Sequence, residues 1–143
     1  MNTPTPTGDR LPPEPYQFHR SDSPSLGDVV DVLDTYFDAL YEADGSKMDA
    51  IFHAHGVYAT ADELPTLVRD KETYLEVLRN RQSPQSRREP RKDFIDSVEF
   101  AGDNTARAQV RCSIGGSDFV DYLTLIRDEG RWQIIAKVFQ VIN

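Results

Sequence analysis

The sequence predicts an α+β fold in which helices cover one face of a curved, mostly antiparallel sheet. Two observations lead to this prediction. Apolar residues recur at helical spacing soon after residue 25, whereas they alternate with polar residues through most of the last third of the chain. Helices that precede a run of strands are typical of domains whose helices gather on one side of a sheet.

Three helices are expected before the main strands. The first follows Ser25, a suitable N-cap with Asp28 three residues later, and its apolar side recurs at helical spacing. That side consists of Leu26, Val29, Val30, Leu33, Tyr36, Phe37, Leu40 and Tyr41. A second, short helix is expected from Ser46, as its cap, to about Phe52. The third is expected to be capped by Asp70 and to run from residue 71 to about residue 81.

Six strands are expected around these helices. Residues 52–60 change from helical to strand periodicity, and residues 64–69 form a short returning strand whose Pro65 suggests a sheet edge. The remaining strands are predicted over residues 94–100, 105–114, 119–127 and 131–139. Because they follow one another with short turns, they are expected to pair as an antiparallel meander.

Length and composition define the domain. Of the 143 residues, the first 24 contain six of the nine prolines and few aliphatic side chains, which predicts a disordered Pro-rich tail before a single domain over residues 25–143. The chain has no apolar run typical of a signal peptide or a membrane span, and its lone Cys112 excludes an internal disulfide. A cytoplasmic protein without a membrane partner is therefore expected.

Charge disfavours one class of partner. The net charge of −8 is unsuited to neutralising phosphates, so nucleic acid is not expected as a partner. Basic residues do cluster between Arg79 and Lys92. This cluster is either a solvated loop, balanced by Glu89 and Asp93, or an anion-recognition rim.

A charged pair is predicted on the apolar face of the last hairpin. If Asp128-Glu-Gly130 forms a three-residue loop, Arg127 pairs with Arg131, and Asp121 then lies opposite Lys137. Strand alternation places Phe119, Leu123, Leu125, Ile135 and Phe139 on the same face. An exposed cross-strand ion pair contributes only about 0.2–1 kcal/mol, so two charges on a buried face call for another reason.

The neighbouring strand indicates that this face points inward. If Gly115-Gly116 is a two-residue turn, Ile114 pairs with Ser117, and Val110 lies opposite Asp121. Ala106, Ala108 and Cys112 then share the inner face, as their alternation requires. The alternative, a three-residue Gly-Gly-Ser turn, would place Arg111 beside Asp121.

The order of these elements and two sequence segments carry a family resemblance. The segments are Phe52-His-Ala-His-Gly-Val-Tyr58 and the hairpin from Phe119 to Phe139. With them, residues 26–141 resemble the NTF2-like superfamily, and within it the SnoaL-like and putative lumazine-binding branch. The resemblance implies an NTF2-like cone, with three N-terminal helices on the curved sheet. It does not specify a substrate, because this fold carries many functions.

Comparison with the ketosteroid isomerase relatives suggests roles for particular residues. Their oxyanion hole pairs a tyrosine of the first helix with a protonated aspartate, and Tyr36 and Asp121 resemble these positions. Their general base is an aspartate, whereas Thr60 stands at the corresponding position here, which leaves His53, His55 or Asp62 as substitutes. Lys137 is a further departure, because it would keep Asp121 ionised.

Two functions follow from these residues. The first is a small-molecule-binding domain whose apolar conical pocket is lined by Tyr58, Phe119, Phe139 and Lys137. The alternative is a cofactor-free isomerase, cyclase or dehydratase with Asp121, His53 and Tyr36 as its catalytic residues. Neither a metal nor a cofactor is expected, since the histidines lack further ligands at metal spacing.

A homodimer is expected through the outer face of the sheet. Helices cover only one face, yet the other is predicted to remain rich in apolar side chains, which favours a partner. These are Val120, Tyr122, Ile126, Trp132, Ile134, Ala136 and Val138.

Overall fold

The computed structural model describes residues 25–142, and the expected tail lies outside the described residues. Within this range the chain forms three helices and six strands. In chain order they are α1 (Ser25–Glu42), α2 (Gly45–Ile51), β1 (Phe52–Thr60), β2 (Leu67–Asp70), α3 (Lys71–Arg79), β3 (Asp93–Phe100), β4 (Thr105–Ile114), β5 (Ser117–Asp128) and β6 (Arg131–Val141).

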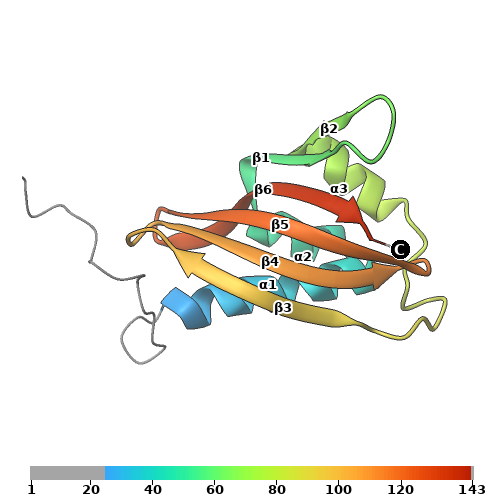
Figure 1. Cartoon of the computed structure of the whole chain (residues 1–143), viewed down its shortest axis with the longest axis horizontal. Coiled ribbons are helices and arrows are strands. Elements are labelled where there is room, and N and C mark those ends of the chain that lie inside the picture. The colour runs from blue at the N-terminus through green and yellow to red at the C-terminus, as the bar shows by residue number, and fades with distance from the viewer. Residues whose placement is uncertain (1–24, 143) are drawn as a thin grey trace, which may run out of the picture.

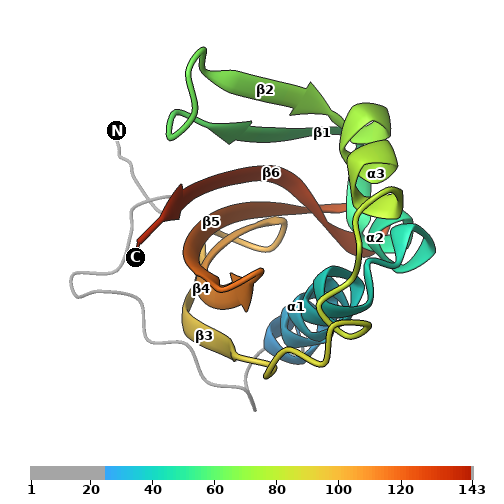
Figure 2. The same ribbon diagram turned by 90° about the vertical axis from the view of Figure 1, so that its right-hand side faces the viewer.

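The strands form one mixed sheet in the order β2-β1-β6-β5-β4-β3. Strands β1 and β6 are parallel, and every other neighbouring pair is antiparallel. Figures 1 and 2 show the sheet curving around the helices, which all lie on its concave side. The predicted α+β class, with helices on one face of a curved and mostly antiparallel sheet, is confirmed.

Capping groups explain where the shorter helices begin. Asp70 caps α3 as predicted, because its carboxylate accepts the backbone N–H of Thr73 at 2.9 Å. The predicted cap of α2 is wrong: Asp44, not Ser46, accepts the free N–H groups of the first turn, those of Ser46 and Lys47. Strand β2 begins at Leu67, two residues after Pro65, and lies at the sheet edge, where a proline is tolerated.

The turn between β4 and β5 has the predicted two-residue form. Gly115 and Gly116 have φ of 62° and 81°, which glycine adopts without the steric cost of a side chain. Ile114 pairs with Ser117, and Val110 lies opposite Asp121. The three-residue alternative, which would have placed Arg111 there, is therefore wrong.

The turn between β5 and β6 differs from the prediction. Glu129 and Gly130 form a two-residue turn with φ of 51° and 78°, so that Asp128 pairs with Arg131. Asp121 lies opposite Phe139 instead of Lys137. The shorter turn moves the partner of Asp121 by one residue, and a bulge in β6 moves it by one more. The total of two residues equals the period of a strand, so the charged pair nevertheless stays on one face.

A β-bulge at Ile135 produces the second shift. Thr124 pairs with Ala136 and Leu125 with Ile134, which leaves Ile135 without a partner. The residues of β6 that precede the bulge, 131–134, point to the opposite face of the sheet from the one predicted. Ile134 and Trp132 are buried and belong to the inner side, so their assignment to the outer face was wrong.

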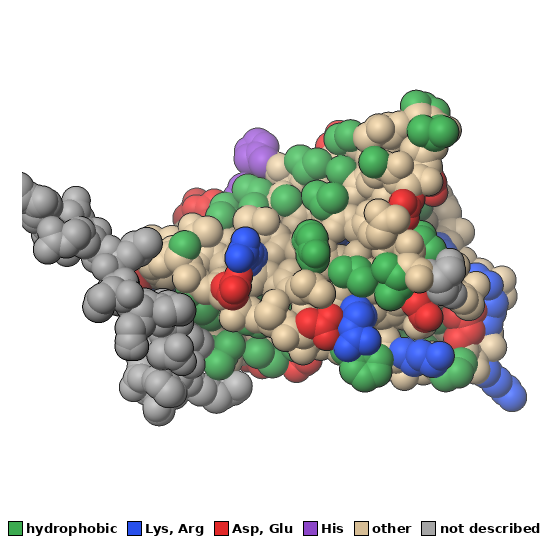
Figure 3. All heavy atoms as spheres, in the orientation of Figure 1, with side chains coloured by type: hydrophobic (Ala, Val, Ile, Leu, Met, Phe, Trp, Pro, Cys, Tyr) green, Lys and Arg blue, Asp and Glu red, His purple; other side chains and the backbone are tan. Residues whose placement is uncertain are grey.

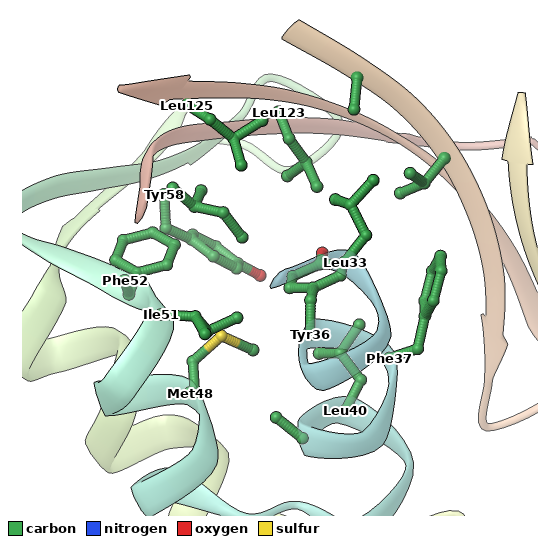
Figure 4. Close-up of a cluster of buried hydrophobic side chains, with 14 of the residues drawn as sticks. Leu33, Tyr36, Phe37, Leu40, Met48, Ile51, Phe52, Tyr58, Leu123 and Leu125 are labelled. Atoms are coloured by element: carbon green, nitrogen blue, oxygen red, sulfur yellow. The ribbon is translucent and has the colours of Figure 1, made fainter. Parts of the chain in front are cut away.

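The core lies between α1 and the concave face of the sheet. Figure 4 shows Leu33, Tyr36 and Phe37 of α1 directed toward the strands that carry Leu123 and Leu125. All of these side chains are buried. The predicted inner residues of β4 are buried as well: Ala106, Ala108, Val110 and Cys112. Small residues on this strand leave room for the large side chains of the helix.

Candidate functional site: a charged pocket at one end of the cone

A cavity of about 560 Å³ opens at one end of the cone. It lies between the ends of β1, β4 and β6, the start of β5 and the segments that follow β1 and α3. The lining residues are Tyr58, Asp62, Glu63, Arg81, Cys112, Ile114, Phe119, Asp121, Lys137, Phe139 and Val141. Five of these eleven side chains are acidic or basic, namely Asp62, Glu63, Arg81, Asp121 and Lys137, so the pocket is more polar than the apolar cone expected from the sequence.

Asp121 and Lys137 form the floor of this pocket. Their side chains are 1% and 7% exposed, and Lys137 Nζ lies 4.0 Å from Asp121 Oδ2. The predicted ion-pair approach on the inner face is therefore confirmed, although the two residues are diagonal neighbours rather than directly opposite. Removing two charges from water is costly, so neighbouring groups must stabilise them.

Tyr36 supplies one of these stabilising contacts. Its hydroxyl, buried at the centre of α1, donates a hydrogen bond of 2.5 Å to Asp121 Oδ2. Burial and the negative charge of Asp121 raise the pKa of Tyr36 well above its ordinary value. The phenol thus stays neutral and remains a donor, and the residue pair inferred from the isomerase resemblance is in contact.

Aromatic side chains surround the Lys137 ammonium. Its Nζ lies 5.1 Å from the ring centroid of Tyr36 and 5.3 Å from those of Tyr58, Tyr74 and Phe139. At these distances the ring faces attract a cation. The hydroxyl of Tyr74 also accepts a hydrogen bond of 3.3 Å from the ammonium.

These contacts keep Lys137 charged. Burial by itself lowers the pKa of the ammonium, but the attraction of Tyr74, Asp121 and Tyr58 outweighs it, so the pKa lies above the ordinary value of a lysine. Because only a neutral amine attacks a carbonyl group, Lys137 is suited to hold a negative or polar ligand group rather than to form a covalent bond.

One carboxylate oxygen of the floor remains unpaired. Among the described residues, Asp121 Oδ1 is buried and has no hydrogen-bond partner.

Cys112, which shares the inner face and also lines the pocket, has a pKa raised to about 12 by burial and by the charge of Asp121. It is a neutral thiol at physiological pH and not a nucleophile.

The rim of the pocket carries the remaining charges. Asp62 is engaged structurally: its two oxygens accept hydrogen bonds from Gln140 Nε2 at 2.6 Å and from the backbone N–H of Val141 at 2.5 Å. Glu63 is exposed on the same loop. Arg81, which follows α3, is half-buried. Exposure thus decreases from rim to floor, as in a pocket that admits a ligand from solvent.

His53 does not join this pocket. It lies at the start of β1, while Tyr58 and Thr60 lie toward the strand's other end. Its Nε2 is 2.8 Å from Asp128 Oδ2, and its Nδ1 accepts the backbone N–H of His55 at 3.1 Å. These residues line a separate depression of about 610 Å³ that does not include Asp121.

Thr60 occupies the position compared with the isomerase base. Its buried hydroxyl donates to the backbone carbonyl of Phe139 at 2.9 Å and accepts the backbone N–H of Asp62 at 3.0 Å. The first bond ties the end of β1 to β6, and the second fixes the turn that follows β1. The hydroxyl is therefore committed to structure, and it supplies no carboxylate for proton abstraction.

The structure brings most of the predicted residues together and adds two. Tyr58, Phe119 and Phe139 line the pocket beside the charged pair, as expected from strand alternation. Tyr74 was not predicted as a site residue, and Arg81 was considered only as a member of the basic cluster, for which an anion-recognition rim was one of two interpretations. The only sequence signals for them were the apolar side of the third helix and the basic cluster that follows it.

Two charges of the basic cluster are balanced locally. Arg91 lies 2.6 Å from Asp38 and 2.5 Å from Asp93, and Arg87 lies 3.6 Å from Glu89. These contacts favour the solvated-loop interpretation for this part of the cluster.

Similar proteins define the class of this fold. An NTF-2 like protein of unknown function from Silicibacter pomeroyi superimposes with a TM-score of 0.75 at 21% identity, covering 87% of this chain and 100% of its own. An NTF2-like protein of unknown function from Methylobacillus flagellatus gives 0.70 at 23% identity, covering 84% and 94%. A ketosteroid isomerase-like protein from Erwinia carotovora atroseptica gives 0.65 at 16% identity, covering 83% and 97%.

The fold is therefore NTF2-like, as the resemblance implied. Residues 25–140 match the family described as "Putative lumazine-binding", and the chain belongs to that family. A search of curated proteins finds no match. Within residues 25–142, no helix is long and apolar enough to cross a membrane, and no cluster of His, Cys, Asp and Glu is arranged to hold a metal ion.

Proposed function

We propose that the protein binds a small organic molecule in the pocket at the end of the cone, oriented by Asp121 and Lys137. The observation that carries this proposal is the pair itself: two charges, almost fully buried, at the floor of a cavity of about 560 Å³. Buried charges are costly, and replacing a purely structural buried ion pair by apolar side chains of similar size is often neutral or stabilising.

The surrounding groups support a binding role. Aromatic rings beside a few convergent polar atoms are the usual composition of a ligand pocket. Lys137 makes one protein hydrogen bond among the described residues, so two of its three N–H donors are available to a ligand. Tyr36 and Tyr74 hold the charged groups from two different helices, which pre-organises them before a ligand enters.

The test is a ligand-observed NMR screen with a library of aromatic fragments. Ile114 lines the pocket near its rim, so Ile114→Trp should fill the cavity and abolish binding of the fragments that enter it. The matched control is Ile95→Trp, on an exposed position of β3 outside the pocket. Fragments that bind both variants equally, or a screen without hits, would contradict the proposal.

A second candidate function, a cofactor-free isomerase, cyclase or dehydratase, is favoured by one observation. The unpaired Oδ1 of Asp121 is a carboxylate oxygen next to a tyrosine donor, an arrangement suited to moving a proton on a carbonyl compound. If this is the function, the protein should catalyse deuterium exchange of the α-protons of bound ketone fragments. Asp121→Asn should abolish that exchange with the fold intact, whereas His53→Gln should not affect it.

We also propose that the protein is a homodimer through the outer face of the sheet. Exposed apolar side chains form a continuous row across four strands there, because Val68 pairs with Ala59, Ala59 with Val138, and Val138 with Tyr122. Val68, Val138 and Tyr122 are 66%, 50% and 60% exposed. Figure 3 shows this face with its apolar side chains among charged groups, a composition typical of an apolar centre with a polar rim.

Light scattering on a size-exclusion column measures this assembly. The dimer mass is expected at micromolar concentration, and Tyr122→Lys should convert it to the monomer. A wild-type monomer would show that the row is simply exposed.

A further inference from the structure

Arg81 differs from Arg87 and Arg91, two basic residues that follow it in the chain. Arg87 and Arg91 lie within ion-pair distance of carboxylates, whereas the guanidinium of Arg81 makes no ion pair within residues 25–142. It is half-buried and lines the pocket. A cation in such a position, without a protein anion, is available to an anion that enters the cavity.

A second cation faces the same cavity from below. Lys137 lies at the floor, 7% exposed, with one hydrogen bond to Tyr74 and with Asp121 at 4.0 Å. Arg81 and Lys137 thus mark two levels of one pocket. Their fields add in a partly enclosed space where screening by water is weaker than at the surface.

The acidic groups of the pocket are largely occupied. Asp121 accepts from Tyr36 and is balanced by Lys137, while both oxygens of Asp62 accept hydrogen bonds from β6. Glu63 is exposed to solvent on its loop. A ligand anion near Arg81 therefore meets the exposed Glu63 carboxylate and two carboxylates that protein donors already hold, and Arg81 is the pocket cation that no described carboxylate pairs.

We infer that the ligand is an aromatic carboxylate whose acid group is bound by Arg81 and whose ring packs against Phe119 and Phe139. This inference rests on the proposed binding function and names the chemical class of its ligand. The planar guanidinium fork matches a carboxylate in shape and forms charge-assisted hydrogen bonds with it. The two phenylalanines, with ring centroids 5.9 Å apart, line the path from rim to floor.

The experiment compares matched acids and amides, which differ in charge but hardly in shape. The probes are 2-naphthoate, cinnamate and phenylacetate, each with its carboxamide, titrated by NMR at low salt. At least one acid should bind about tenfold more tightly than its amide, the expected effect of one charge-assisted contact at a partly exposed site. Arg81→Gln should remove this difference by weakening the acid alone.

Two further variants separate charge recognition from a structural effect. Glu63→Gln removes the exposed one of the two rim carboxylates and should strengthen acid binding about twofold, with the amide unchanged. Arg88→Gln is the matched control, because Arg88 belongs to the same basic cluster, is exposed and does not line the pocket. It should leave both probes unchanged.

The outcomes distinguish this inference from the function on which it rests. Amides that bind as tightly as their acids, or an Arg81→Gln variant that weakens both equally, would overturn the carboxylate assignment and leave the binding function standing. Failure of every probe to contact the pocket at millimolar concentration would overturn the assignment as well, and a failed fragment screen beside it would contradict the binding function.

Discussion

The two faces of the sheet carry ion pairs that differ in an instructive way. On the outer face, Arg111 Nε lies 2.8 Å from Asp96 Oδ2, with side chains 44% and 27% exposed. On the inner face, Lys137 and Asp121 are 4.0 Å apart and almost fully buried. The outer pair has the better geometry, yet the inner pair is the one whose disruption should matter.

Burial, more than distance, decides the consequence of breaking each pair. When the outer partners separate, water and salt ions replace most of the electrostatic stabilisation that the two charges lose. An inner charge that loses its partner remains in a poorly solvated space, where water cannot replace the lost electrostatic stabilisation. The predictions below test this difference, beginning with the largest expected effect.

Lys137→Met should destabilise the protein by about 3–5 kcal/mol, the typical result of removing one partner from a buried ion pair. Methionine fills a similar volume, so the loss reflects the uncompensated Asp121 carboxylate. Urea unfolding at neutral pH measures it. The control is the double variant Lys137→Met with Asp121→Asn, which should recover much of the loss; a single variant as stable as the wild type would contradict this account.

Tyr36→Phe should cost about 1–3 kcal/mol, because it removes the donor to a buried carboxylate oxygen while keeping the ring in place. Thr66→Val is the control, since it deletes a hydroxyl from an exposed loop position that does not line the pocket. The same urea experiment applies. Equal effects of the two substitutions would mean that the Tyr36 hydrogen bond does not support the floor of the pocket.

The inner face should also determine how stability responds to alkali. The pKa of Cys112 is raised to about 12 in the folded protein from an ordinary value of 9.0, so the unfolded chain loses this proton first. Stability is therefore complete below about pH 9 and should fall above it, by at most about 1.4 kcal/mol per pH unit for this group. Cys112→Ala should flatten the decline between pH 9 and 10. A decline of unchanged slope would assign it to other groups.

Strand alternation made the inner face predictable. Four small or apolar side chains of β4 indicate the buried side without ambiguity, and only a two-residue Gly115-Gly116 turn places Asp121 on it. That reasoning identified the charged floor of the pocket correctly, because the face depends on a period of two that tertiary packing does not change.

The last hairpin shows where sequence reasoning fails. Asp128-Glu-Gly130 is compatible with a two-residue or a three-residue loop, and no glycine or proline marks the bulge at Ile135. The wrong turn length and the missed bulge each shift the pairing by one residue. At Lys137 the two shifts add to a full strand period, so its face was predicted correctly. Ile134 and Trp132 precede the bulge, undergo only the first shift and were assigned to the wrong face.

Tyr74 was missed, and Arg81 was not singled out within the basic cluster, for another reason. Both depend on how α3 crosses the sheet. That arrangement is set by packing between distant segments, and local periodicity does not report it.

The smallest effect is expected from the outer pair. Arg111→Gln should leave urea unfolding nearly unchanged, because Asp96 then returns to water instead of remaining as a buried charge. Asp96 has a lowered pKa, caused mainly by its hydrogen bond to Arg111. A lowered pKa adds stability above the pKa of the unfolded carboxyl, and that contribution disappears as the pH falls through the folded value. The variant should therefore differ from the wild type least in high salt and at acidic pH, and most at low salt and neutral pH. A loss comparable to that of Lys137→Met would show that geometry outweighs burial in this sheet.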